Sequence, residues 1–118
     1  MAEENGWVKL FNIKDYSSQA VSFTYTGNGN SGESYPNEIP ITDSTKIVII
    51  SRESDEGAIA IFIRGSNIGM SFTTSGNDYP HHGKLLLNWD DERLTWYAQN
   101  PSTQLNVNNA TYHCVNIG

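Results

Sequence analysis

Aromatic rings, amides, carboxylates and imidazoles gather between Gly76 and Tyr97, a stretch that holds two of the three tryptophans and two of the three histidines of the 118-residue chain. Rings of this kind stack on a ligand, while the polar side chains hydrogen-bond its polar groups. The mixture favours a recognition surface over a catalytic centre. The candidate ligand-binding residues of this stretch are Asp78, Tyr79, His81, His82, Asn88, Trp89, Asp90, Asp91, Trp96 and Tyr97.

Two tryptophans flank a short acidic turn, Asp90–Glu92, and this arrangement predicts a stacking platform. If the turn is tight, Trp89 and Trp96 lie on neighbouring strands and approach each other across the hairpin. Sugar C–H faces can then pack against the indole rings while neighbouring amides and carboxylates bond the hydroxyls. The alternative is that one or both rings belong to the hydrophobic core.

Metal binding would need three or four convergent ligands. The segment Asp78–Gly83 has loop punctuation, and only in a loop can adjacent histidines turn toward one ligand, because successive side chains on a strand alternate. Calcium on Asp90 and Asp91 stays open, although this acidic turn lacks the glycine and the spaced oxygens of an EF-hand loop. We expect no required cofactor.

No nucleophile elbow, zinc-protease, CxxC, Walker or dinucleotide-binding pattern occurs in the chain. His113 and Cys114 are neighbours, so on a strand they face opposite sides and cannot act as a base and nucleophile pair. Cys114 is the single cysteine, which excludes an intramolecular disulfide, and we expect it to be a small buried apolar residue. The sequence therefore predicts a protein that is not an enzyme.

The net charge of −6 limits the possible partners. An acidic surface repels phosphate backbones, so nucleic acid is excluded, whereas neutral glycans or zwitterionic lipids fit. The longest apolar runs, Ile47–Ile50 and Ala58–Ile63, are too short to cross a bilayer. Because the first residues lack the features of a signal peptide, we expect a cytoplasmic protein or one released without such a signal.

Strand signals recur along the chain and are separated by turns rich in Gly, Asn and Asp. Ala20–Thr26 alternates between apolar and polar residues, as a half-buried strand does. Lys46–Ser51 and Ala58–Arg64 are almost continuously apolar, which is typical of strands deep inside a sandwich. The other expected strands are Trp7–Ile13, Ile68–Thr73, Lys84–Trp89, Arg93–Ala98, Gln104–Val107 and Thr111–Ile117.

Eight or nine short strands in a single domain, residues 1–118, predict an antiparallel β-sandwich with jelly-roll or Greek-key connections and almost no helix. A closed barrel is the alternative. Gly27–Pro40 is expected to be a long loop and, with Tyr35, the second candidate ligand-contacting segment. The phenylalanines expected in the core are Phe11, Phe23, Phe62 and Phe72.

Four segments of the second half of the chain carry a resemblance: Gly57–Ile63, Gly83–Asp91, Asn108-Asn109 and Val115–Gly118. They resemble the second half of the small calcium-dependent galactose-binding bacterial lectins. The resemblance implies a β-sandwich lectin in which Asp91 and Thr95 match the calcium-binding positions. The two asparagines that follow in that family are replaced here by Ala98-Gln99-Asn100.

A second resemblance rests on Trp7-Val8 and on Lys46–Arg52 followed by Gly57. These segments look like the aegerolysins, acidic single-domain β-sandwiches that recognise membrane lipids. The Trp-Asp-Cys-Pro-Trp segment of that family would fall at Trp89–Arg93, where the first two residues agree.

Together these features predict a lectin-like, non-enzymatic protein that binds glycans on cell surfaces. The alternatives are an aegerolysin-like membrane-lipid-binding protein and a protein-interaction module. A homo-oligomer would suit a lectin because weak sugar sites gain from multivalency.

Overall fold

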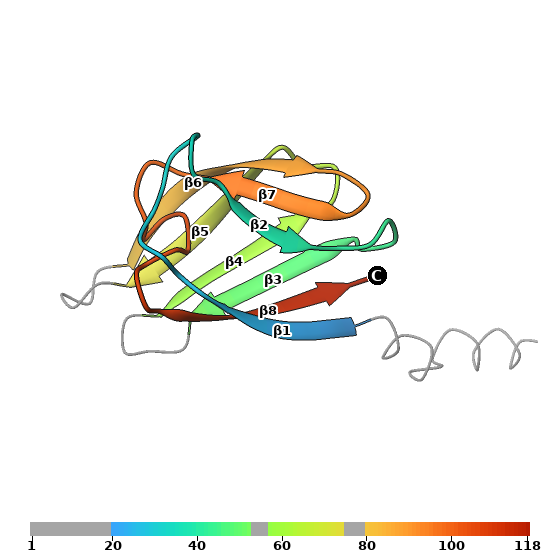
Figure 1. Cartoon of the computed structure of the whole chain (residues 1–118), viewed down its shortest axis with the longest axis horizontal. Coiled ribbons are helices and arrows are strands. Elements are labelled where there is room, and N and C mark those ends of the chain that lie inside the picture. Colours follow the sequence, from blue (N-terminus) through green and yellow to red (C-terminus); the bar gives the residue numbers. More distant parts are fainter. Residues whose placement is uncertain (1–19, 53–56, 75–79) are drawn as a thin grey trace, which may run out of the picture.

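A computed structural model describes residues 20–52, 57–74 and 80–118 of the chain, and in these residues it contains strands and no helix (Figure 1). The expectation of an all-β, antiparallel fold is therefore confirmed. The eight strands are β1 (Ala20–Thr26), β2 (Asn37–Pro40), β3 (Ile47–Arg52), β4 (Ala58–Ile63), β5 (Ile68–Thr74), β6 (Pro80–Trp89), β7 (Arg93–Tyr97) and β8 (Thr111–Ile117).

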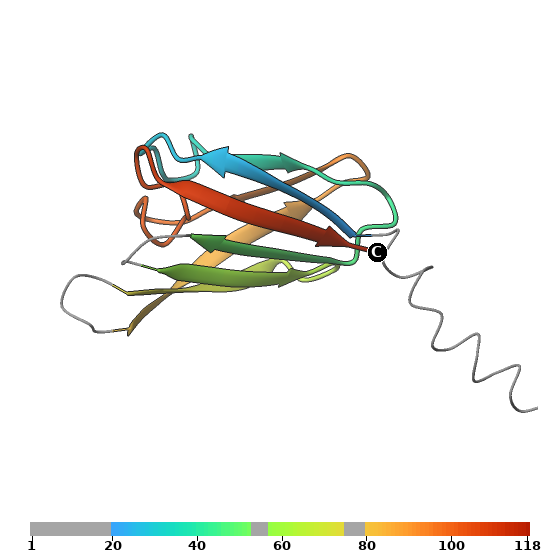
Figure 2. The same ribbon diagram turned by 90° about the horizontal axis from the view of Figure 1, so that it is seen from below.

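All eight strands belong to one hydrogen-bonded sheet with the order β1-β8-β3-β4-β5-β6-β7-β2. Strands β3 to β7 form a meander, β8 returns beside β3, and β1 and β2 lie at the two edges. The sheet curls into a half-barrel with both edge strands on the same side (Figure 2). The side-chain amide of Asn116 donates a 2.9 Å hydrogen bond to the carbonyl of Pro40, which joins β8 to the end of β2 across the opening. The described strands thus form one curled sheet rather than the two sheets expected of a sandwich.

The concave face of the sheet holds the core. Because side chains alternate along a strand, Val48 and Ile50 of β3 point inward together with Phe62 of β4 and Tyr112 of β8. The ring of Phe62 lies 5.3 Å from that of Trp96. Phe62 is thus a core residue as expected, and Phe23 packs partly buried against the core. Phe72 is instead exposed on the convex face, which corrects its assignment to the core, and Phe11 lies outside the described residues.

The connections divide the half-barrel into two ends. At one end, here called the turn end, lie the short connections formed by residues 41–46, 64–67 and 90–92. At the other, here called the loop end, two long connections cross between distant strands: residues 27–36 join β1 to β2, and residues 98–110 join β7 to β8. Figure 1 shows both long loops on the same side of the molecule.

Three elements differ from the sequence-based expectation. Strand β6 begins at Pro80, four residues before the expected Lys84, so His81 and His82 are strand residues rather than loop residues. Strand β2 forms inside the segment expected to be a loop. Residues 104–107 form no strand, and Leu105 there has a φ of 63°. The expected strand at residues 7–13 lies outside the described residues.

Candidate functional site

The ligand-binding residues predicted from the sequence lie at two separate ends of the molecule. Strand β6 has ten residues, so its ends are about 30 Å apart at the usual rise per residue. Asn88 and Trp89 lie at the turn end with the acidic turn, whereas His82 and Tyr97 lie toward the loop end. The single recognition rim expected from the sequence is therefore not formed. Asp78, Tyr79 and the side chain of His81 lie outside the described residues.

Trp96 is a core residue. Its side chain is 1% exposed, and its indole Nε1 donates a 2.8 Å hydrogen bond to the carbonyl oxygen of Gln104. The register pairs Trp96 with Leu87 on the concave side of the sheet. The prediction that Trp96 stacks on a ligand is wrong, because strand alternation turns this position inward and the core encloses the ring.

Trp89 braces the turn end. Its indole Nε1 donates a 2.9 Å hydrogen bond to the carbonyl of Ser66, and the guanidinium carbon of Arg64 lies 5.6 Å from the ring centroid. The Arg64 guanidinium also donates to the carbonyls of Thr42, Thr45 and Asp90 at 3.0, 2.8 and 2.9 Å. Arg64 therefore fastens three turns together and covers the indole of Trp89, which is only partly accessible.

The two aspartates of the acidic turn differ in their surroundings. One carboxylate oxygen of Asp90 accepts hydrogen bonds from the backbone N–H groups of Glu92 and Arg93 at 2.8 and 2.6 Å, and these bonds lower the pKa of Asp90. Asp91 is exposed, with a carboxylate oxygen 3.8 Å from the Arg64 guanidinium. The part of the chain that the structure describes contains no group of three or more His, Cys, Asp or Glu side chains able to hold a metal ion. Among these residues, Asp90 and Asp91 therefore do not form part of a larger group of carboxylates or imidazoles that could bind calcium.

Gln104 ties the two long loops together. Its side chain is fully buried, and its Oε1 accepts hydrogen bonds from the backbone N–H groups of Gly32 and Ala98 at 3.0 and 2.9 Å. Its Nε2 donates to the carbonyl of Tyr35 at 2.8 Å and to Oδ1 of Asn37 at 3.0 Å. All four side-chain hydrogen-bonding positions of the amide are therefore used, as burial requires.

Asn106 repeats this arrangement two residues later. Its Oδ1 accepts from the backbone N–H of Asn28, and its Nδ2 donates to Oδ1 of Asn28 and to the carbonyl of Asn30. Gly27 must be glycine here, because a Cβ would lie 2.1 Å from the carbonyl oxygen of Val107. Gln104 and Asn106 thus fix residues 27–36 and residues 98–110 as one rigid unit.

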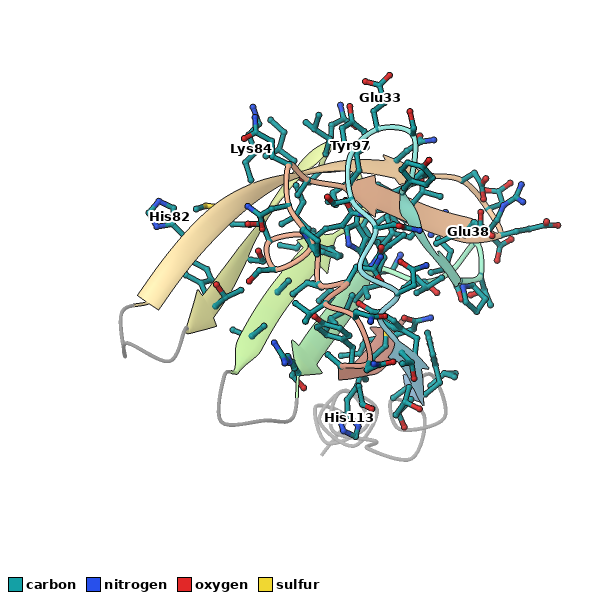
Figure 3. All side chains as sticks on the ribbon, turned by 60° about the vertical axis from the view of Figure 1, so that its left-hand side comes forward. Glu33, Glu38, His82, Lys84, Tyr97 and His113 are labelled. Carbon is teal, nitrogen blue, oxygen red and sulfur yellow. The ribbon has the colours of Figure 1, made fainter. Side chains whose placement is uncertain are left out.

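A cleft with a volume of about 560 Å³ opens where this unit meets β6 and the end of β7, and we call it the loop-end cleft. Figure 3 shows Glu33, Lys84 and Tyr97 gathered on one side of the molecule, with His82 farther along β6. The lining residues are Gly32, Glu33, His82, Gly83, Lys84, Leu86, Tyr97, Ala98, Gln99, Asn100 and Thr103.

The cleft combines one aromatic ring with several kinds of polar group. Tyr97 is half-buried, while Glu33 and Lys84 are exposed and carry opposite charges. Oδ1 of Asn100 accepts a 2.9 Å hydrogen bond from the backbone N–H of Thr103, which fixes the orientation of the amide. Such a surface can stack one face of a ligand and hydrogen-bond its edges.

Of the residues predicted from the sequence, the cleft contains His82 and Tyr97. It adds Lys84 and Asn100, which the sequence did not predict, and Glu33, which lies in the segment Gly27–Pro40 predicted as the second ligand-contacting segment. The alternation of His82, Lys84 and Leu86 would have placed these three on one face if β6 had been extended to Pro80. No sequence signal marked Asn100 or Thr103 of the second loop.

Tyr35 lies beside a different cavity. Its exposed ring borders a smaller hollow of about 280 Å³, lined also by Asn28, Asn30, Glu38 and Asn106. Asn88 is exposed on the convex face at the turn end. Neither residue belongs to the loop-end cleft.

Comparisons with protein-family models, with curated proteins and with solved structures gave no match to the chain. Among the residues described, no helix is long and apolar enough to span a membrane.

Proposed function

We propose that the protein is a lectin-like, non-enzymatic carbohydrate-binding protein and that the loop-end cleft takes a short neutral glycan. The observation that carries the proposal is the position of the Tyr97 ring in a polar cleft that also holds Glu33, Lys84 and Asn100. The site lies where the sheet meets a loop unit that buried hydrogen bonds hold rigid.

The chemistry of the cleft suits a sugar ring. The C–H face of a pyranose packs on the ring of Tyr97, and Leu86 extends the apolar floor. Glu33 accepts hydrogen bonds from sugar hydroxyls, Lys84 donates to them, and the amide of Asn100 can do both. Because the hydrogen bonds of Gln104 already hold the two long loops in place, little free energy is spent on ordering them when the ligand binds.

The charges of the cleft favour a neutral ligand. The charges of Glu33 and Lys84 are opposite in sign, so they leave the cleft without a net charge. The whole chain carries a net charge of −6, so it would repel a polyanion. Glu33 is the single carboxylate among the described residues that line the cleft. Glycoside hydrolysis usually needs a pair of carboxylates across the scissile bond, which supports binding without turnover.

The alternative is an aegerolysin-like lipid-binding protein. A zwitterionic lipid headgroup carries one cation and one anion, which could pair with Glu33 and Lys84. A stacking ring with amides beside it favours the sugar. Liposomes belong in the test for this reason, and a protein-interaction module would bind neither ligand.

The test screens the full-length chain on a glycan array and on zwitterionic liposomes, and then titrates the best ligand into the parent and into Tyr97→Ala and Asn88→Ala by calorimetry. Asn88→Ala is the matched control, because Asn88 lies on the neighbouring strand at the turn end. We expect Tyr97→Ala to lose about tenfold in affinity, the control to bind as the parent does, and a calcium chelator to change nothing. A parent that binds only liposomes, or a Tyr97→Ala variant that binds the glycan as the parent does, would contradict the proposal.

A further inference from the structure

The convex face of the sheet is apolar over β4 and β5. Six large side chains on these two strands leave between 43% and 59% of their surface in solvent, and we call them the isoleucine face. They are contiguous, because the register pairs Ile59 with Phe72 and places Ile61 and Ile63 against Ile49 and Ile47 of β3. The six residues are Ile59, Ile61, Ile63, Ile68, Met70 and Phe72.

The same sheet also shows what a solvated convex face looks like. On β1 the outward positions are Ser22, Thr24 and Thr26, which follow the usual alternation of a sheet with one wet face. On β4 the outward positions are all isoleucine, while the inward face of that strand is already filled by Ala60 and Phe62. Strand β4 is therefore apolar on both faces, as strands buried on both faces are.

The isoleucine face is large for a surface that stays in water. Six large side chains, each about half exposed, present on the order of 500 Å² of apolar surface. This is near the upper limit for the largest apolar patch of a typical monomer. With the half-buried Ile47 and Ile49 and a polar rim it approaches the roughly 800 Å² that each partner contributes to a standard interface.

We propose that a second copy of this chain packs its isoleucine face against this one, so that two curled sheets form a sandwich across a two-fold axis. All six residues of the face are uncharged and apolar, so the face is complementary to itself, as an isologous contact must be. Face-to-face packing about 10 Å apart is the ordinary way in which two β-sheets bury such surfaces. The proposal does not rest on glycan binding, although the face borders the loop-end cleft: Ile68, Met70 and Phe72 pair with Leu86, Lys84 and His82 of β6.

Two features favour a second copy over a lipid bilayer. The isoleucine face contains no Trp or Tyr, the residues that anchor proteins at a membrane interface. The net charge of −6 gives no attraction to anionic lipids. An apolar face of Ile, Met and Phe is instead the composition of a homodimer interface, which is more apolar than the average protein surface.

Sedimentation velocity of the full-length chain tests the proposal, with Ile61→Lys at the centre of the face, the milder Ile61→Thr, and Ser22→Lys as the matched control on β1. We expect a parent dimer at about 100 µM, at least about a tenfold weaker dimer for Ile61→Thr, and a folded monomer for Ile61→Lys. Ser22→Lys should dimerise as the parent does. Circular dichroism shows whether each variant is folded. If Ile61→Lys does not fold, the dimer affinity of Ile61→Thr tests the proposal.

A parent that stays monomeric at that concentration overturns the proposal, whatever then covers the face. Parent and Ile61→Thr are therefore also spun with phosphatidylcholine vesicles. If the parent is monomeric and binds the vesicles through Ile61, the face is a lipid-binding surface. A dimer that Ile61→Lys and Ile61→Thr leave unchanged would place the interface elsewhere and overturn the proposal as well.

Discussion

The indole of Trp96 and the main-chain carbonyl of Gln104 are joined by a 2.8 Å hydrogen bond that links the core of the half-barrel to its loop end. The same carbonyl accepts a second bond from the side-chain amide of Asn37 at 3.2 Å. Trp96 thus helps to position the loop that forms the loop-end cleft, and its buried ring does not line that cleft.

Gln104→Leu should lower the free energy of unfolding by about 2–4 kcal/mol. Leucine is similar in size, but it cannot bond the backbone N–H of Ala98, the carbonyl of Tyr35 or the side chain of Asn37. Urea denaturation of the parent and the variant measures this difference. Gln99→Leu is the control, because Gln99 is exposed in the same loop, and it should change stability by less than about 0.5 kcal/mol. Equal stability of Gln104→Leu and the parent would show that Gln104 does not hold the loops.

Arg64→Met should loosen the turn end. The variant loses three hydrogen bonds to backbone carbonyls and the contact with the Trp89 ring, so we expect a loss of about 1–3 kcal/mol. Arg93→Met removes only an exposed ion pair with Asp90 at 3.7 Å and should cost little. Thermal unfolding measures the stability of both variants. Similar melting temperatures for the two would contradict the role of Arg64 in holding the turns together.

Asp90 should contribute to the acid sensitivity of the fold. Because its pKa is lowered in the folded state, its contribution is present above the unfolded value of about 3.9 and is lost as the pH falls through the folded pKa. Asp90→Asn keeps an acceptor oxygen but does not titrate, so its stability should fall less than that of the parent between pH 7 and about pH 3. Asp43→Asn, at an exposed position, is the control, and identical pH dependence for parent and Asp90→Asn would refute this prediction.

Cys114 should be unreactive in the folded protein. Its side chain is fully buried, and burial raises the pKa of its thiol to about 12. We expect a thiol reagent at neutral pH to label the urea-unfolded chain quickly and the native chain slowly. The raised pKa also means that the contribution of Cys114 to stability is complete below the unfolded value of about 8.5 and declines as the pH rises from there toward 12. Fast labelling of the native chain would contradict the burial.

Alternation and β-branched runs were sufficient to predict most strands from the sequence. The pattern of residues 20–26 and the apolar runs of β3 and β4 agree with the structure within a residue or two. The start of β6 was missed because Pro80 and Gly83 suggest a loop. Proline is tolerated at the first position of a strand, and Gly83 packs so closely on Thr103 that a Cβ there would lie 2.0 Å from the Thr103 methyl group.

The site could be predicted only in part, because its geometry depends on long-range contacts. Whether Trp89 or Trp96 faces the core follows from the sheet register, which a single sequence does not reveal. The cleft itself depends on Gln104 and Asn106, whose side-chain hydrogen bonds to residues 28–37 span 67 to 78 residues of sequence. Such polar residues usually indicate an exposed loop, and here they are buried because their amides replace backbone hydrogen bonds.

The position of the bound glycan decides whether the loop-end cleft is the binding site. A titration of the full-length, ¹⁵N-labelled chain with the glycan selected on the array, followed by amide chemical shifts, locates the site in solution. We predict that the largest shifts fall on the amides of Glu33, Lys84, Tyr97 and Asn100, and that residues 88–93 at the turn end do not move. Shifts confined to residues 88–93 or to the surroundings of Tyr35, or no shifts with the selected glycan, would show that the loop-end cleft is not the binding site.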